Sequence, residues 1–403
     1  MKKYIYLSLV LLMGFVASCS EAPDYSDKVF LTGTLSNDKI NFNIFGTTST
    51  GITVTSTAKT ETDITAKVVP APEMLDAYNE KMERNYQVPP TESYSVNTDV
   101  VTIEAGKSIS TPVVITAHAD KLKDGVAYCL PITIQSCNGQ GILEASRTAY
   151  VVFTKVIETK VAQMNGGAYF DIPSFNTRDG GDLWALNALT LECKVRPSRL
   201  SSSLAESSIN PIMGSHESLL LRFGDGSNIP ANKLNFAKVS IGTDYHPDNK
   251  PHYESTFEET FENDQWYHVA VVYDGSKVKF YLNGELKIEK NTTGGQINLA
   301  MSYGGHGWDD TFAIGRSYGT HWTYKGCISE VRIWNKARSV AEIQDGVCYV
   351  DPSSDGLVSY WRFNGELQDD GKGGKYVRDE TGHGHDAIPT GTINWVENQK
   401  CPF

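Results

Sequence analysis

The chain has 403 residues, and because 40% of them are hydrophobic and 21% charged, the composition excludes an intrinsically disordered protein. Its length is enough for about two or three domains with buried cores. A formal net charge of −12 makes nucleic acid an unfavourable partner, because an acidic surface repels phosphate backbones.

The first residues have the pattern of an export signal. Two lysines precede an apolar run at residues 5–16, which is too short to span a bilayer. The run ends in the letters VASC, which resemble the lipobox of bacterial lipoproteins. This resemblance implies that residues 1–18 are a signal peptide and that Cys19 carries the lipid, which would be the only membrane anchor. The alternative is a secretory signal with a chance cysteine.

Residues 19–28 are predicted to be a tether. Glu21 and Asp24 lie in this segment. Early acidic residues of this kind resemble the surface-export signal of Bacteroidetes-type lipoproteins. The resemblance implies an outer-membrane protein whose folded part faces the cell exterior.

Residues 29–156 are predicted to form a first β domain with one helix. The helix is predicted from Pro72 at its first turn and from Met74, Tyr78 and Met82, which repeat on one helical face. Segments rich in β-branched residues predict strands at 52–54, 100–103, 113–115, 130–134 and 150–153. Many short strands separated by Pro and Gly turns favour an immunoglobulin-like sandwich.

This first domain resembles an N-terminal domain of unknown function found on Bacteroidetes glycan-handling lipoproteins. The letters VTIEAGK at 101–107 and YCLPI at 128–132 carry the resemblance. It implies a spacer or platform without known chemistry.

A short connector is predicted at residues 157–164, and a second β domain at 165–403. Alternating apolar residues predict strands at 189–195, 219–223, 234–241, 266–273 and 277–282. Asp-Gly and Asn-Gly pairs supply the turns between the later strands.

The second domain resembles the laminin-G-like, or concanavalin A-like, jelly rolls. The hairpin WYHVAVVYDGSKVKFYLNGEL at 266–286 and the segment at 312–343 carry this resemblance. The family mostly binds carbohydrate or protein. The resemblance therefore implies an all-β chain in which an Ig-like sandwich precedes a glycan-binding or protein-binding jelly roll.

The order of segments in this domain departs from the family pattern. The segment LVSYWRF at 357–363 usually opens such a domain, but here it stands near the end. About 45 residues cannot build a second sandwich alone. We therefore expect a circular permutation, in which the last strands complete the sheets begun at residue 165; a truncated second repeat is the alternative.

Catalytic motifs are missing from the sequence. Concanavalin-like glucanases carry two catalytic carboxylates on one strand as Glu-x-Asp-x-x-Glu, whereas ENDQWY at 262–267 ends in Tyr. Glu330 and Arg332 lie two residues apart on a predicted strand, so we interpret them as a structural pair. The chain is therefore predicted not to be an enzyme.

Two loops around Phe312 combine aromatic and polar residues, as sugar-binding sites do. Trp266, Trp334 and Trp361 instead lie in apolar strand patterns and are predicted to be core. The predicted ligand contacts are Tyr303, His306, Trp308, Asp309, Arg316, Tyr318, His321 and Trp322, with Tyr245 and His246 as weaker candidates.

No cofactor is required by this interpretation, although calcium is the usual metal of the resembled family. The candidate ligands of a structural calcium are Asp179, Asp182, Asp309 and Asp310, but their spacing is not specific. His383 and His385 could hold zinc, but their alternation with Gly favours a turn.

Export would permit disulfides among the six cysteines that follow Cys19. Cys129 and Cys137 lie on one predicted strand and are too far apart to pair if it is straight. Cys348 and Cys401 bracket the C-terminal segment and are the predicted disulfide; six buried thiols are the alternative.

The expected function is capture of an oligosaccharide or polysaccharide at the cell surface. A glycan is the expected ligand, and an outer-membrane transporter or hydrolase is the expected neighbour. A scaffold that binds proteins and a divergent glycoside hydrolase remain the alternatives.

Overall fold

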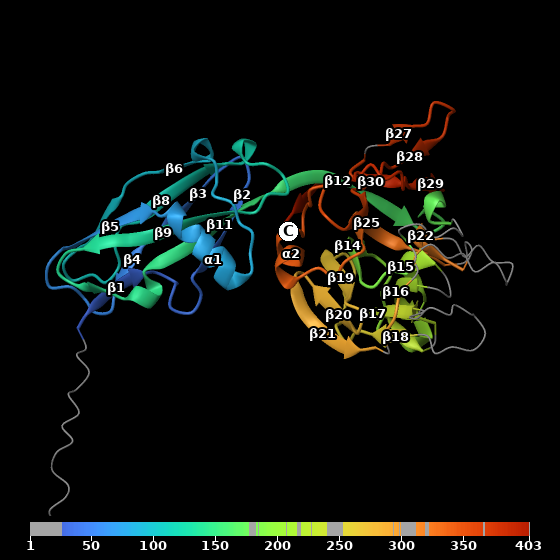
Figure 1. The fold of residues 1–403 in the computed structure, drawn as a ribbon, viewed down its shortest axis with the longest axis horizontal. Coiled ribbons are helices and arrows are strands. Elements are labelled where there is room, and N and C mark those ends of the chain that lie inside the picture. The colour runs from blue at the N-terminus through green and yellow to red at the C-terminus, as the bar shows by residue number, and fades with distance from the viewer. Residues whose placement is uncertain are drawn as a thin grey trace, which may run out of the picture.

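The computed structural model describes residues 26–176, 183, 185–206, 208–215, 219–226, 228–239, 253–292, 294–297, 299, 312–318, 322–365 and 367–402. These residues form two β domains that follow each other along the chain (Figure 1). The predicted all-β fold is confirmed.

The N-terminal domain is a β sandwich. Its strands are β1 (Lys28–Leu31), β2 (Lys39–Ile44), β3 (Thr47–Ile52), β4 (Val54–Ser56), β5 (Ile64–Pro70), β6 (Tyr94–Val96), β7 (Val100–Ile103), β8 (Val113–His118), β9 (Tyr128–Cys137), β10 (Gly141–Ile142) and β11 (Thr148–Lys155). Among the described residues they form a five-stranded sheet, β2-β11-β9-β5-β7, and two three-stranded sheets, β3-β8-β6 and β10-β1-β4. Alternate apolar residues of these strands make one shared core, as the predicted sandwich requires.

The predicted helix is α1 (Leu75–Met82), which follows a 3-10 turn that begins at Pro72. Leu75 and Tyr78 are buried against Cys129 and Val152, so α1 covers one face of the five-stranded sheet. Met82 was expected on the same face but is 42% exposed. The helix ends there, because the next residue is left-handed, and its last turn extends past the buried cluster.

The C-terminal domain consists of two large sheets. Its elements are β12 (Ile157–Asn165), β13 (Tyr169–Asp171), β14 (Leu189–Pro197), β15 (Asn210–Ser215), β16 (Leu219–Asp225), β17 (Ile229–Val239), β18 (Tyr253–Thr256), β19 (Tyr267–Tyr273), β20 (Lys277–Leu282), β21 (Glu285–Asn291), β22 (Ala313–Ile314), β23 (Arg316–Ser317), β24 (Trp322–Thr323), β25 (Lys325–Trp334), α2 (Val340–Asp345), β26 (Leu357–Trp361), β27 (Gln368–Asp369), β28 (Lys375–Tyr376), β29 (Ile388–Thr390) and β30 (Asn394–Cys401). Within the described segments, one sheet has eight strands, β21-β20-β19-β14-β25-β12-β30 with β26 beside β25, and the other has seven, β18-β17-β16-β15-β22-β13-β29. Their facing apolar side chains form a single core.

The last strands of the chain complete both sheets. β26 pairs with β25, and β30 pairs with β12 in the eight-stranded sheet. β29 pairs with β13 in the seven-stranded sheet. The expectation that these strands finish sheets begun earlier in the chain is confirmed, and a separate second repeat is excluded.

The predicted connector at 157–164 is wrong. These residues belong to β12, which leaves the N-terminal domain and runs directly into the eight-stranded sheet (Figure 1). Ala162 and Met164 are buried in its core, and Val161 is buried as well, so the burial of apolar side chains stabilises this segment. The C-terminal domain therefore begins at Ile157.

The two domains also touch through α2. The helix begins with a capping box in which Ser339 and Glu342 bond each other's backbone N–H groups. Arg84 of the N-terminal domain pairs with Asp345, the last residue of α2, at 3.2 Å, and also donates to the carbonyl of Ala341, the second residue of the helix, at 3.3 Å. A cation at a helix C-terminus is favoured by the helix dipole.

Candidate functional site

The described surface of the C-terminal domain contains an open cleft of about 450 Å³, within the usual range for small-ligand sites. Segments far apart in the sequence form its walls: the turn after β12, the residues on either side of the 3-10 turn between β14 and β15, and β24 with the start of β25. We call it the Trp322 cleft. It is lined by Asn165, Gly166, Gly167, Arg199, Ser208, Ile209, Trp322, Thr323 and Lys325.

Trp322 lies on a two-stranded ribbon that β23 and β24 form, paired with Ser317. Its side chain is half-buried, and its ring centroid is 4.9 Å from that of Tyr318 at a tilt of 33°. Tyr318 turns the chain at the end of β23 with a left-handed φ of 57°. The ribbon thus presents a supported indole at the cleft.

Two glycines shape the opposite wall. Gly166 and Gly167 have φ values of 92° and 74°, a region that favours glycine. The Gly167 N–H donates to the Thr323 hydroxyl at 2.7 Å. This bond ties the turn after β12 to the ribbon that carries Trp322.

The floor of the cleft is held by Lys325 and its backbone partners. The Lys325 N–H donates to Oδ1 of the buried Asn210 at 2.9 Å, and the Lys325 carbonyl accepts from the Ser198 N–H at 3.1 Å. Asn210 and Ser198 are the chain neighbours of the lining residues Ile209 and Arg199. These backbone bonds therefore hold the segments that carry Ile209 and Arg199 to the start of β25.

The cleft is cationic, although the whole chain is acidic. Arg199 is exposed and Lys325 is half-buried, and both side chains line the cleft. Within the described part of the chain, neither forms an ion pair and no carboxylate lines the cleft. The local potential should therefore be positive.

Three of the predicted ligand contacts lie in the described residues, and the structure places two of them at the cleft and one in the interior. Trp322 lines the cleft and Tyr318 supports it. Arg316 does not reach the surface: it is 4% exposed and donates to Asp171 from Nε at 3.2 Å and from Nη2 at 2.8 Å. This ion pair, with the Tyr169 ring 5.0 Å away, fastens β23 to β13 and corrects the expectation of a direct ligand contact.

The other predicted contacts stay predictions. Tyr245, His246, Tyr303, His306, Trp308, Asp309 and His321 lie outside the described residues. Conversely, Arg199 and Lys325 were not predicted, because nothing in either strand pattern shows that residues 126 positions apart share one wall.

Two of the three predicted core tryptophans are confirmed. Trp334 and Trp361 are 2% and 0% exposed, but Trp266 is only half-buried. Trp266 precedes β19 and lies 5.4 Å from the cations of both Lys194 and Arg196. Its apolar strand pattern was therefore misleading, because the ring packs under polar side chains.

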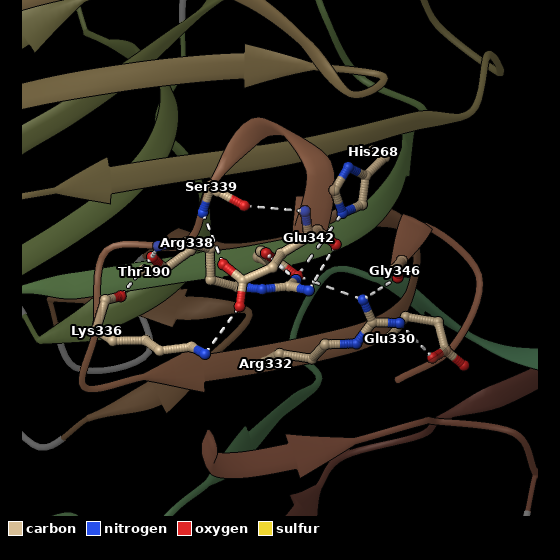
Figure 2. A network of polar contacts seen from close by, with 10 residues as sticks. Thr190, His268, Glu330, Arg332, Lys336, Arg338, Ser339, Glu342 and Gly346 are labelled. Carbon is tan, nitrogen blue, oxygen red and sulfur yellow. Dashed lines mark hydrogen bonds and ion pairs between the residues drawn. The ribbon is translucent and has the colours of Figure 1, made fainter. Parts of the chain in front are cut away.

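A second cluster of ionisable residues lies beneath α2, on the face of the eight-stranded sheet that points away from the main core (Figure 2). Glu192 is completely buried and accepts hydrogen bonds from Arg338 and, at 3.3 Å, from Arg332. Burial alone would raise the pKa of Glu192, but the two guanidinium groups outweigh it and hold the pKa below its usual range. Glu192 is thus a permanent anion and a poor general acid.

Glu330 belongs to the same network and lies at a β-bulge of strand β25. Its φ is 52°, where the register between β14 and β25 shifts. The carboxylate is 3% exposed and accepts from Arg332 at 2.8 Å, from Arg362 at 3.4 Å and from the Tyr360 hydroxyl. The predicted Glu330–Arg332 pair is confirmed, and a carboxylate so enclosed cannot reach a substrate.

The two histidines of the predicted turn have structural partners. His383 Nδ1 is 2.9 Å from the Val358 carbonyl, and His385 Nδ1 is 2.8 Å from the Ser174 hydroxyl. The described residues contain no cluster of three metal-ligating side chains. The calcium candidates Asp179, Asp182, Asp309 and Asp310 lie outside those residues, so the calcium site stays a prediction.

Cys348 and Cys401 form a disulfide, as predicted, and it fastens the end of β30 to the segment after α2. Cys129 and Cys137 both lie on β9 and are free thiols. Cys19 lies outside the described residues, so its lipidation stays a prediction. In the parts of the chain that are described, no helix is both long and apolar enough to cross a membrane.

The fold can now be compared with known families. Residues 165–344 match the Laminin_G_3 family model, described as the concanavalin A-like lectin/glucanases superfamily. The C-terminal domain is a laminin-G-like domain. The match ends at α2, so the strands that complete the laminin-G-like sheets lie beyond it. Residues 25–141 match a second family model, which describes an N-terminal domain.

One solved structure shows the same architecture. A Bacteroides ovatus protein described as a "putative carbohydrate binding protein" is 22% identical, with a TM-score of 0.53 over 92% of this chain and 98% of that chain. This likeness shows a shared fold for the N-terminal and laminin-G-like domains together. No curated protein matches the chain.

Two further likenesses are too remote to carry an inference. A SAP-like pentraxin from Limulus polyphemus is 13% identical, with a TM-score of 0.36 over 61% of this chain and 98% of its own. The Ruminococcus gnavus IT-sialidase CBM40, bound to α2,3 sialyllactose, is 13% identical, with a TM-score of 0.33 over 47% of this chain and 96% of its own.

Proposed function

We propose that this protein binds a glycan in the Trp322 cleft and presents it without cleaving it. The observation that carries the proposal is the combination of a half-buried indole with hydroxyl and amide groups in one open cleft. A sugar ring offers C–H groups on its faces and hydroxyls around its edge. An indole packs against the faces, and Asn, Ser and Thr side chains bond the hydroxyls.

Binding without cleavage is supported by where the carboxylates lie. Glycoside hydrolysis needs two carboxyl groups that flank the bond to be broken. Among the described residues that line the cleft there is no Asp or Glu. Among the described residues of the laminin-G-like domain, the buried carboxylates Glu192 and Glu330 are enclosed in ion pairs beneath α2. The third, Asp379, accepts hydrogen bonds from the Tyr360 N–H at 3.0 Å and the Thr381 hydroxyl at 2.8 Å. The Bacteroides ovatus protein of similar fold is also described as carbohydrate binding.

We further propose that the protein works at the outer surface of the outer membrane, held by a lipid on Cys19. The export pattern of residues 1–18 and the acidic tether support this location. The N-terminal domain would act as a spacer that holds the laminin-G-like domain away from the membrane. Captured glycan would pass to a neighbouring transporter or hydrolase.

A glycan array probed with the chain lacking residues 1–19 tests the binding proposal. We expect signals from one glycan class that fall strongly for Trp322→Ala and persist for Phe45→Ala. Phe45 is a suitable control because it is 50% exposed and lies on the N-terminal domain. An array without signal, or equal signals for both variants, would overturn the proposal, and retention on an immobilised protein partner would favour a scaffold.

The anchoring proposal needs a separate test. Whole cells that express the full chain should lose the protein's laminin-G-like domain to an added protease, and Cys19→Ser should release the protein from the membrane fraction. A Cys137→Ser control should remain in that fraction. Membrane retention of Cys19→Ser would contradict lipid anchoring.

A further inference from the structure

The charge of the Trp322 cleft indicates which glycans it selects. The chain has a net charge of −12, and basic side chains of its sheets such as Lys277, Arg316 and Arg338 are paired with carboxylates. Arg199 and Lys325 form no ion pair within the described residues, and both line the same cleft. We infer that the cleft selects acidic glycans, whose carboxylate or sulfate group binds Arg199 and Lys325 while the sugar ring packs on Trp322. This inference rests on the proposed function.

The two cations are brought together by the backbone. The Ser198 N–H donates to the Lys325 carbonyl at 3.1 Å. Arg199 is the next residue after Ser198, so its backbone lies close to that of Lys325. The Lys325 backbone is also fixed on its other side by the buried Asn210. Backbone hydrogen bonds therefore place Arg199 and Lys325 next to each other before any ligand binds.

The path of the Lys325 side chain is also built into the fold. It crosses Gly166, where a Cβ atom would lie 2.7 Å from Lys325 Cε and 3.6 Å from Nζ. The absence of a side chain at Gly166 thus leaves the room that the lysine occupies. The ammonium group therefore lies beside this wall of the cleft.

The residue types fit an anion with planar or tetrahedral oxygens. Arginine offers paired N–H donors that match a carboxylate or sulfate in two parallel hydrogen bonds, and lysine adds a compact charge. Without a carboxylate among the described lining residues, nothing in this part of the cleft neutralises the two cations. A neutral sugar would leave both cations without a partner, whereas an acidic sugar would supply one.

Matched pairs of probes test the inference. They are an oligogalacturonide and its methyl ester, sialyllactose and lactose, and a heparin-derived oligosaccharide before and after desulfation. Isothermal titration on the chain lacking residues 1–19 should show that the acidic member of one pair binds about tenfold or more tightly than its neutral partner, and less tightly as salt rises. The pair that shows this difference identifies the anion as uronate, sialate or sulfate.

Charge-removing variants complete the test. Arg199→Gln, at an exposed position, and Lys325→Gln should each reduce the acidic preference without lowering the melting temperature, whereas Lys375→Gln on β28 should keep the preference. Equal affinities for the members of every pair, or an acidic preference that survives both variants, would overturn the inference. If a neutral glycan binds and Trp322→Ala abolishes its binding, the proposed function stands and only the acidic selectivity fails. If none of the probes nor any array glycan binds, the proposed function fails.

Discussion

The buried imidazole of His268 should make the stability of the laminin-G-like domain depend on pH. His268 lies on β19, is completely buried, and has Nε2 4.0 Å from Glu192 Oε2. Burial lowers the pKa of His268 to about 3, and nearby Arg332 and Arg338 oppose protonation further, against the attraction of Glu192. The folded domain therefore keeps this ring neutral at pH values where the unfolded chain protonates it.

The sign and size of the effect follow from this difference. The stabilisation from a neutral His268 is fully present above the unfolded pKa of about 6.5 and is lost as the pH falls toward 3, at about 1.4 kcal/mol per pH unit. Between pH 6.5 and 4.5 the loss from this one group is about 2 kcal/mol. Lys194 also has a lowered pKa, of about 7, but it is largely protonated in both states in this window.

Urea unfolding followed by tryptophan fluorescence measures the loss of stability of the laminin-G-like domain. All seven tryptophans of the chain lie after residue 157, so the signal reports on the laminin-G-like domain alone. His268→Leu removes the titrating group, and because neither ring nitrogen has a hydrogen-bond partner among the described residues, it removes no bond. The free energy of unfolding should therefore change with pH by about 2 kcal/mol less in this variant than in the parent.

The control is His383→Asn, which changes an exposed histidine of the same domain and leaves the buried ring in place. It should keep the pH dependence of the parent. If the free energy of unfolding changed equally with pH in His268→Leu and in the parent, the buried ring would take up its proton as readily in the folded domain as in the unfolded chain. That result would refute the reasoning.

Three other changes test how the chain is held together. Cys348→Ser opens a disulfide that closes a 53-residue separation, so loop entropy predicts a loss of about 4 kcal/mol, and melting with and without reductant should differ in the parent only. Arg84→Ala leaves Asp345 without its cation across the domain boundary, so we expect a larger radius of gyration by small-angle scattering; an unchanged profile would contradict a fixed boundary. Gly326→Ala places a Cβ 2.4 Å from a backbone oxygen at a φ of 143°, so we expect a loss of about 3 kcal/mol or more, whereas a normal melting temperature would show that the backbone adjusts freely.

The strands were predictable because their residues repeat with the period of the sheet. In β14, for example, Leu189, Leu191, Cys193 and Val195 face the main core, as their alternation indicates. The alternation did not show that Glu192 and Lys194 would be buried as well. Glu192 is bonded by Arg338, which precedes α2 and comes more than 140 residues later in the chain. Lys194 lies 5.4 Å from the ring of Trp266.

The cleft could be predicted only in part for a similar reason. Trp322 stood out because polar residues and glycines surround it in the sequence. Arg199 and Lys325 lie beside it only because β14 and β25 pair in the sheet, and no local pattern encodes that pairing. Arg316 has similar neighbours in the sequence to Trp322, yet it is buried in an ion pair with Asp171 on β13.

The central claim is that a glycan binds against Trp322, and one titration tests it most directly. The tightest glycan from the array is titrated calorimetrically into the chain lacking residues 1–19 and into its Trp322→Ala variant. Removing a central aromatic contact typically costs about 2 kcal/mol or more, so the account predicts that the Kd rises about 30-fold while the melting temperature changes little. A Kd that stays the same in the variant would contradict the account.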